Sequence, residues 1–148
     1  MKIIIGNDHT AVLLKQEILN HLAENHKISA ADCGAQDGQG PDYPSCAREL
    51  TGKIQSGEYA LGILLCGTGA GMCIAANKMP GIRAVVCSEP YTAQMSRRHN
   101  NANILCIGTR VVGPELAKLI VDAFLAAKFE GGRHAERVAK IAAMEGDS

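Results

Sequence analysis

The chain has 148 residues, of which 47% are hydrophobic and 20% are charged. Its fifteen basic and fifteen acidic side chains cancel, which argues against broad binding to nucleic acid or to a membrane surface. With no tryptophan, three tyrosines and two phenylalanines, the chain has few rings on which bases could stack. This length and composition predict one globular domain over residues 1–148, with a core large enough to fold without a metal or a disulfide.

The six cysteines form no C-x-x-C pair, and the histidines do not complete a zinc-binding spacing. Free thiols in a reducing cytosol are the simplest interpretation. We therefore expect a cytoplasmic protein with no disulfide, no metal and no cofactor. The apolar run at Met1–Gly6 is too short for a signal peptide or a membrane span.

Short apolar runs alternate along the chain with segments of helical period. The runs, which we expect to be strands, lie at Lys2–Gly6, Ile28–Cys33, Ala60–Leu65, Ile82–Cys87 and Asn103–Ile107. In the first helical segment Leu14, Ile18 and Leu22 form an apolar stripe, and Lys15 is expected on the solvent side. Further helices are expected after Asp42-Tyr43-Pro44 as far as Ser56-Gly57, after the glycine-rich stretch that follows Cys66, over Pro90–Arg98, from Pro114 to about Ala127 and over His134–Met144.

This alternation predicts an α/β, Rossmann-like three-layer fold, with a five-stranded parallel sheet covered by helices on both faces. Ligands of such sheets bind at the carboxyl ends of the strands, near the point where the strand order reverses. Asp8 and His9 follow the first strand, Cys66 ends the third, and Arg110 follows the fifth. We expect the end of the fourth helix, at His99, to lie near the same edge.

Cys66 ends an apolar strand, and the glycine-rich stretch Gly67–Gly71 that follows it opens a helix. Unpaired N–H groups and the helix dipole favour a thiolate at this position. A thiolate can take a proton from a carbon next to a carbonyl. A simple buried cysteine is the alternative, and we prefer the catalytic base because of the setting.

The glycine stretch differs in spacing from the dinucleotide-binding G-x-G-x-x-G motif and lacks the Lys-Ser/Thr of a P-loop. An ordinary tight turn would explain it equally well. Placed directly after Cys66, however, its backbone amides could hold an enediolate oxygen.

Three other groups allow both a structural and a functional interpretation. Asp8 is well placed as a helix N-cap. His99 is either a favourable charge near a helix end or an acid–base group that opens a sugar ring. Arg133, Arg137 and Lys140 share one face of the last predicted helix. A solvated face is the common explanation, but two arginines one turn apart also suit a phosphate group.

These motifs together resemble the type B ribose-5-phosphate isomerases and the related galactose-6-phosphate and allose-6-phosphate isomerases. The similarity spans nearly the whole chain. It is sharpest at Cys66–Gly71, Ala75–Lys78, Gly81–Ala84, Ser88–Tyr91, His99–Asn100 and Gly131–His134. The resemblance implies a metal-independent aldose–ketose isomerase of the pentose phosphate pathway that acts on ribose 5-phosphate, with the two hexose phosphates as alternative substrates.

The resemblance also implies roles for individual residues. Cys66 would shuttle a proton between C1 and C2, Thr68 and the glycine stretch would steady the enediolate, and His99 with Asp8 would open the furanose ring. The residues implied to hold hydroxyls and phosphate are Asp8, His9, Tyr43, Gly67, Thr68, Gly69, Ala70, Gly71, Asn100, Arg110, Arg133, His134 and Arg137. The implied assembly is a homodimer or a dimer of dimers, in which the C-terminal helix reaches the partner subunit and brings Arg133 and Arg137 to its site.

The sequence departs from this family pattern in two places. Thr10-Ala11-Val12 stands where relatives usually carry a glycine and a bulky aromatic residue, and Ala35 replaces a usual threonine. We expect both changes to lie along the sugar and to affect the choice of substrate. A non-catalytic nucleotide or sugar-phosphate binding module is an alternative from another class. Cys66 with His99 favours the enzyme, because a sensor needs the arginines but no base.

Overall fold

The computed structural model describes residues 1–146. Its strands are β1 (Ile3–Asn7), β2 (Ala31–Asp32), β3 (Leu61–Cys66), β4 (Ala84–Val86) and β5 (Ile104–Gly108). Its helices are the 3₁₀ turn η1 (His9–Ala11), α1 (Val12–Asn25), α2 (Tyr43–Gln55), α3 (Ala70–Ala76), α4 (Pro90–Asn100), α5 (Pro114–Ala126) and α6 (Arg133–Met144). Each predicted strand and helix is present, and β2 is much shorter than its apolar run suggested.

The five strands form one parallel sheet in the order β2-β1-β3-β5-β4. The chain turns outward from β1 to the edge strand β2 and then returns to place β3 on the other side of β1. The strand order therefore reverses between β1 and β3. At this point the backbone N–H of Asp8 donates to the carbonyl of Leu65 at 3.1 Å, so Asp8 and Cys66 end neighbouring strands.

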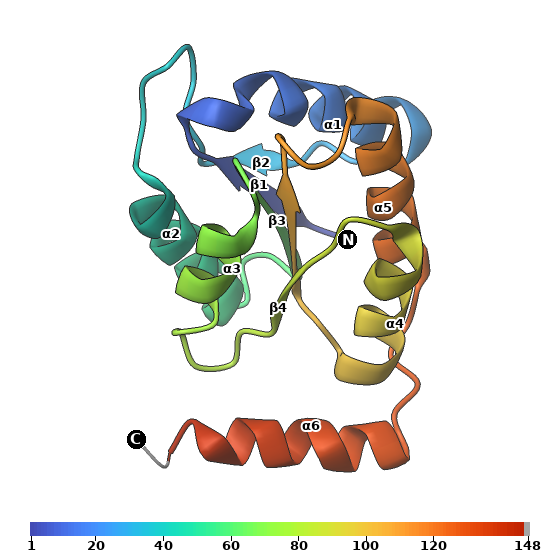
Figure 1. The fold of residues 1–148 in the computed structure, drawn as a ribbon. Coiled ribbons are helices and arrows are strands. Elements are labelled where there is room, and N and C mark those ends of the chain that lie inside the picture. The colour runs from blue at the N-terminus through green and yellow to red at the C-terminus, as the bar shows by residue number, and fades with distance from the viewer. Residues whose placement is uncertain (147–148) are drawn as a thin grey trace.

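Helices cover both faces of the sheet, as predicted: α1, α4 and α5 lie on one face and α2 and α3 on the other (Figure 1). Alternate residues of each strand point to opposite faces. On β3, Ile63 and Leu65 belong to the core beneath α1, α4 and α5, whereas Leu64 and Cys66 belong to the core beneath α2 and α3. The side chain of Cys66 is thereby directed toward the α3 side.

Lys15 is buried, which corrects the expectation that it faces solvent. Its side chain is 3% exposed, and its Nζ lies 3.0 Å from Asp32 Oδ2 and donates to the carbonyl of Ala35 at 2.6 Å. The loop after β2 covers this side of α1, and the long lysine stem lets the ammonium group reach that loop. Lys15 therefore ties α1 to the edge of the sheet.

The last helix, α6, lies across the edge of the sheet opposite the carboxyl ends of the strands (Figure 1). It contacts α4 near its N-terminus, and near its C-terminus the Glu145 carboxylate accepts a hydrogen bond from the Gly81 N–H at 2.8 Å. Among residues 1–146, no helix has the length and apolar character needed to cross a membrane.

Candidate active site

Cys66 is the last residue of β3 and is 4% exposed. The Gly69 N–H points at its Sγ at a distance of 3.2 Å, and the Ala70 N–H donates to Thr68 Oγ1, also at 3.2 Å. Gly69 has a φ of +81°, a left-handed conformation that favours glycine. The backbone thus folds around the sulfur and directs the Gly69 N–H toward it.

The turn between β5 and α5 holds this glycine loop in place. The Thr109 N–H donates to the Cys66 carbonyl at 2.9 Å, and the Arg110 N–H donates to the Gly67 carbonyl at 3.0 Å. Gly108 packs so closely that a Cβ on it would lie 2.5 Å from the backbone of Thr68. Sequence reasoning missed Gly108, for which the only signal was a glycine ending a strand next to a glycine loop.

Asp8 lies beside this loop at the end of β1 and is 8% exposed. It is the N-cap of η1, as predicted, because its Oδ1 accepts the Thr10 N–H at 2.9 Å and the Thr10 hydroxyl at 2.6 Å. Within residues 1–146 its second oxygen, Oδ2, accepts no hydrogen bond, so it can accept one from a ligand. His9 is exposed on the first turn after Asp8.

Tyr43 and Arg110 border the same loop from two other elements. The Tyr43 ring, at the start of α2, lies so close to Gly71 that a Cβ on this glycine would be 2.8 Å from the ring. The Arg110 side chain extends past Gly67, where an added Cβ would be 3.5 Å from its Nη1. The structure therefore brings together one group of predicted residues: Asp8, His9, Tyr43, Cys66, Gly67, Thr68, Gly69, Ala70, Gly71 and Arg110.

The expectation that His99 lies at this edge is wrong for a single chain. α4 runs antiparallel to the strands, so its end at His99 and Asn100 lies at the amino ends of the strands (Figure 1). Asn103, just before β5, accordingly bonds to Gly62 at the start of β3. A strand as long as β3 separates His99 from Cys66 by roughly 16 Å along the sheet. Every crossover helix of a parallel sheet returns the chain to the amino edge.

His99 instead forms a second cluster with the start of α6. Its ring stacks on that of His134 with centroids 4.2 Å apart and an angle of 6° between the planes. Glu130 Oε1 lies 3.8 Å from Nε2 of His99 and 3.7 Å from Nε2 of His134. Asn100, Arg133 and Arg137 are exposed beside this pair.

Two members of this histidine cluster, Glu130 and His134, have shifted pKa values. A hydrogen bond from Arg98 lowers the pKa of Glu130, which keeps that carboxylate ionised beside the Nε2 atoms of the two rings. Burial and then the neighbouring His99 and Arg133 lower the pKa of His134, which favours its neutral form. Sequence reasoning missed Glu130, whose only signal was an acidic residue directly before Gly131.

The two departures from the family pattern occupy positions different from those expected. Ala11 is 0% exposed and Ala35 is 1% exposed, so neither methyl group faces open space beside Asp8. Thr10 does touch the site, through the hydrogen bond from its hydroxyl to Asp8. Asn7, which is fully buried, links β1 to the Ala35 loop by donating to the Ala35 carbonyl at 3.2 Å.

A further thiol lies near the sheet, on α3. The pKa of Cys73 is lowered to about 7, chiefly by a hydrogen bond from Cys106, and that interaction together with complete burial raises the pKa of Cys106.

Two groups of residues within 1–146 combine histidines with a carboxylate in a way that could hold a metal ion, and neither contains Cys66 or Asp8. They are His21, His26 and Asp122, and His99, Glu130 and His134.

Known proteins are similar to this protein over almost its entire chain. The family model described as Ribose/Galactose Isomerase matches residues 3–141. Ribose-5-phosphate isomerase B of Escherichia coli is 54% identical over 97% of this chain and 96% of its own, and D-erythrulose-4-phosphate isomerase of Pectobacterium atrosepticum is 46% identical over 98% and 95%. The structure of Clostridium thermocellum ribose-5-phosphate isomerase B superposes with a TM-score of 0.95, at 50% identity and with 99% of both chains covered. The chain belongs to the Ribose/Galactose Isomerase family.

Proposed function

We propose that this protein interconverts ribose 5-phosphate and ribulose 5-phosphate, with Cys66 as the base. The observation that carries this proposal is the buried Cys66 sulfur, which accepts the Gly69 N–H at the end of the strand paired with the one that Asp8 follows. An E. coli relative that is 54% identical bears the name ribose-5-phosphate isomerase B. The six free cysteines fit a reducing cytosol.

The proposed reaction begins with the open-chain aldose. The Cys66 thiolate takes the proton from C2, and the electrons of that bond form a C1=C2 double bond while O1 becomes an oxyanion. In this proposal, amides of the loop after Cys66 stabilise this charge. Cys66 then returns its proton to C1, the C2 hydroxyl gives its proton to O1, and a carbonyl remains at C2.

Ring opening requires an acid–base group, and within one chain His99 is too far from Cys66 to supply it. We infer that His99 of the partner subunit completes each site. The two clusters lie at opposite edges of the sheet, so two copies could each place a histidine cluster over the other's Cys66. His99 with Glu130 would protonate the ring oxygen while Asp8 Oδ2 accepts the proton of the anomeric hydroxyl.

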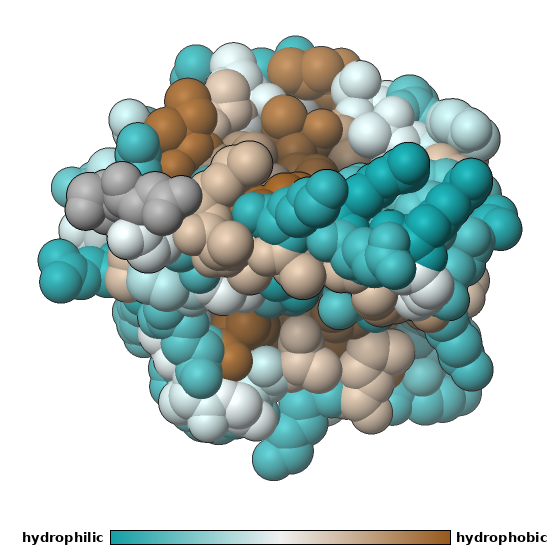
Figure 2. All heavy atoms as spheres, turned by 90° about the horizontal axis from the view of Figure 1, so that it is seen from below, coloured by the Kyte–Doolittle hydropathy of each residue, from teal (hydrophilic) through white to brown (hydrophobic). Residues whose placement is uncertain are grey.

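The surface of α6 supports a shared site. In this helix, which the structure describes in full, His134 alone is buried. Ile141 is 45% and Met144 66% exposed, and Figure 2, drawn from the α6 side, shows apolar surface left open beside hydrophilic groups. A helix with an uncovered apolar face gains free energy by packing on another surface, for which we propose a second copy of the chain.

Arg133 and Arg137 of α6 would bind the phosphate from the partner subunit. Both guanidinium groups are exposed, and within residues 1–146 neither forms an ion pair. They lie one helical turn apart, which suits the oxygens of one phosphate group. A homodimer, alone or as half of a tetramer, is the minimum unit that this arrangement requires.

Substitution of Cys66 tests the proposed base. Cys66→Ala should lower kcat by several orders of magnitude while phosphate binding and the fold survive, because only the thiol can both accept and return the proton. Cys87→Ala is the matched control, since Cys87 is also buried but lies on the other face of the sheet. Retention of more than about a tenth of kcat by Cys66→Ala, a loss below ~1.4 kcal/mol, would contradict the assignment.

A panel of sugar phosphates tests the substrate. Ribose 5-phosphate should give the highest kcat/KM, ahead of galactose 6-phosphate, allose 6-phosphate and erythrulose 4-phosphate. The last compound belongs in the panel because a relative of 46% identity is named for it. A chelator should leave turnover unchanged. A higher kcat/KM on any of the other three would replace ribose 5-phosphate as the substrate while leaving Cys66 as the base.

Mixing two inactive variants tests the shared site. Cys66→Ala and Arg137→Ala proteins are combined and allowed to exchange subunits. If sites are shared, each mixed dimer has one site with both lesions and one with neither, so about a quarter of wild-type activity should return by this symmetry count. Exchange is verified by mass measurement of tagged subunits. No recovery after verified exchange would show that each site is built from one chain.

A further inference from the structure

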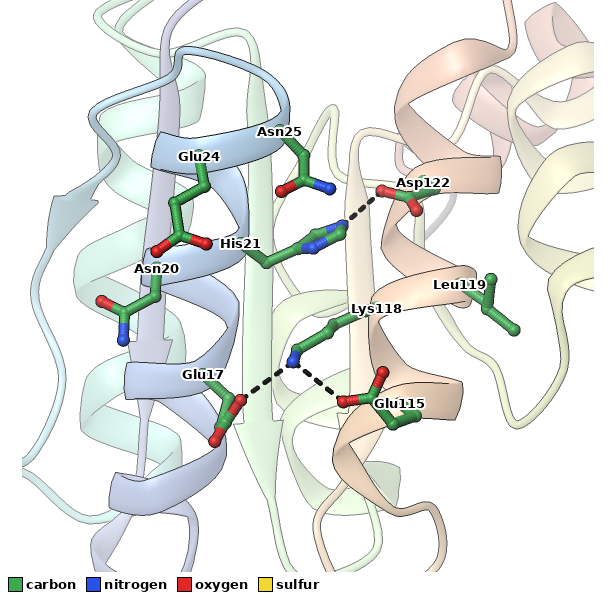
Figure 3. A pocket seen from close by; sticks show the side chains of 9 residues that line it. All are labelled: Glu17, Asn20, His21, Glu24, Asn25, Glu115, Lys118, Leu119 and Asp122. Atoms are coloured by element: carbon green, nitrogen blue, oxygen red, sulfur yellow. Dashed lines mark hydrogen bonds and ion pairs between the residues drawn. The ribbon is translucent and has the colours of Figure 1, made fainter.

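A polar cluster joins α1 to α5 on the face of the molecule away from α2 and α3. His21 lies on α1, His26 directly follows α1, and Asp122 lies on α5. Nε2 of His21 is 2.6 Å from Asp122 Oδ1, and Nε2 of His26 is 2.7 Å from the same oxygen. Figure 3 shows His21 and Asp122 pointing toward each other across the groove between the two helices. The two imidazoles therefore converge on one carboxylate oxygen.

We propose that His21, His26 and Asp122 bind a divalent transition-metal ion of the Zn²⁺ type. Their ligand atoms lie within 4.8 Å of one another. Two imidazole nitrogens and one carboxylate oxygen are a donor set that zinc accepts, with a water in the fourth position. None of the three residues takes part in the isomerisation proposed above.

The observed geometry is close to that of a bound ion. Zinc binds imidazole nitrogen at 2.0–2.1 Å, so ligand atoms of a tetrahedral site lie roughly 3.3 Å apart. Each of the two distances from an imidazole Nε2 to Asp122 Oδ1 must therefore lengthen by about 0.6 Å. His21 is fixed, with a side chain only 10% exposed, whereas His26 and Asp122 are 26% and 40% exposed and can shift. A neutral imidazole that binds through Nε2 carries its proton on Nδ1, so two N–H···O bonds are exchanged for three metal bonds.

The surroundings also favour a cation. A hollow of about 540 Å³ opens beside His21 and Asp122 and leaves room for a water ligand. Its lining includes three further carboxylates, those of Glu17, Glu24 and Glu115. The one lysine of this lining is Lys118. Its Nζ lies 3.0 Å from a carboxylate oxygen of Glu17 and 3.0 Å from one of Glu115, so these two ion pairs compensate its positive charge (Figure 3).

A bound ion would act on stability and leave the chemistry unaffected. His21 and Asp122 are 101 residues apart in sequence, so the ion would fasten α1 to α5 in the folded chain only. α1 begins near Asp8 and is about 20 Å long, which places the cluster far from Cys66. We therefore expect metal binding to raise the unfolding temperature and to leave kcat unchanged.

Titration of the full-length, reduced protein with Zn²⁺ and with Co²⁺ tests the proposal. Calorimetry should detect one Zn²⁺ per chain in wild type, and His26→Gln and Asp122→Asn should weaken that site at least tenfold. Both variants keep all six cysteines, which controls for thiol binding. The double variant His99→Gln/His134→Gln removes the other histidine cluster and should retain the site. Bound Co²⁺ should show visible bands of a nitrogen–oxygen site without a strong thiolate charge-transfer band.

Thermal unfolding supplies a second measurement. Zn²⁺ at about a hundred times its Kd should raise the wild-type unfolding temperature by roughly 5 °C or more and should not raise that of His26→Gln. His26 lies at a helix end, so its variant should fold. Equal Zn²⁺ affinity of wild type and both single variants, or loss of the site in His99→Gln/His134→Gln, would overturn the proposal. The cluster would then be a carboxylate that only bridges two imidazoles.

Discussion

Gly108→Ala is expected to damage the proposed active site from a position that itself has no proposed contact with substrate. A Cβ on Gly108 would lie 2.5 Å from both the carbonyl carbon and the oxygen of Thr68. Ordinary contact begins at 3.4 Å, so the backbone after Cys66 must move by about 0.9 Å. Displacement of a catalytic group by about 1 Å costs ~100-fold in rate, which corresponds to about 2.7 kcal/mol of barrier. Overpacking should also cost about 1–3 kcal/mol of stability.

The assay is kcat for aldose–ketose conversion, measured together with urea unfolding. Gly52→Ala is the matched control, because Gly52 lies inside α2 and nothing would lie within 4 Å of its Cβ. That control should keep full turnover and gain about 0.5–1 kcal/mol of stability, since alanine favours helices. A Gly108→Ala protein of wild-type stability that keeps more than about a third of kcat would refute the reasoning.

Three other predictions concern Lys15, Cys73 and His99. Lys15→Met should destabilise the fold by about 2 kcal/mol in urea unfolding, because Asp32 loses its buried partner; an unchanged midpoint would contradict this. In a background without the Cys66 thiol, iodoacetamide should modify Cys73 with a pH midpoint of about 7, whereas Cys87, whose pKa burial raises to about 12, should stay unmodified at that pH by peptide mass mapping. His99→Asn should impair turnover of the cyclic substrate more than that of an open-chain one, and equal losses would assign His99 to binding or to proton transfer.

The sequence alone determined the fold to the level of its layers. Apolar runs marked all five strands because a parallel sheet buries both faces of each strand, and this requirement leaves a continuous hydrophobic stretch. The order of these runs and of the helical segments then placed Asp8 and Cys66 at the same edge of the sheet, whereas the pairing of their two strands came from the structure. The capping role of Asp8 was also predictable, because an N-cap depends on residues only two or three positions away.

Contacts between residues far apart in sequence were decided by the tertiary structure. The direction of α4 places His99 at the edge opposite Cys66, and the loop after β2 buries Lys15. No spacing in the sequence indicated that His21 and His26 meet Asp122, because side chains on two packed helices become neighbours only after both helices dock on the same face of the sheet. Local patterns report the burial and backbone preference of each segment, whereas proximity across about a hundred residues depends on how the segments pack.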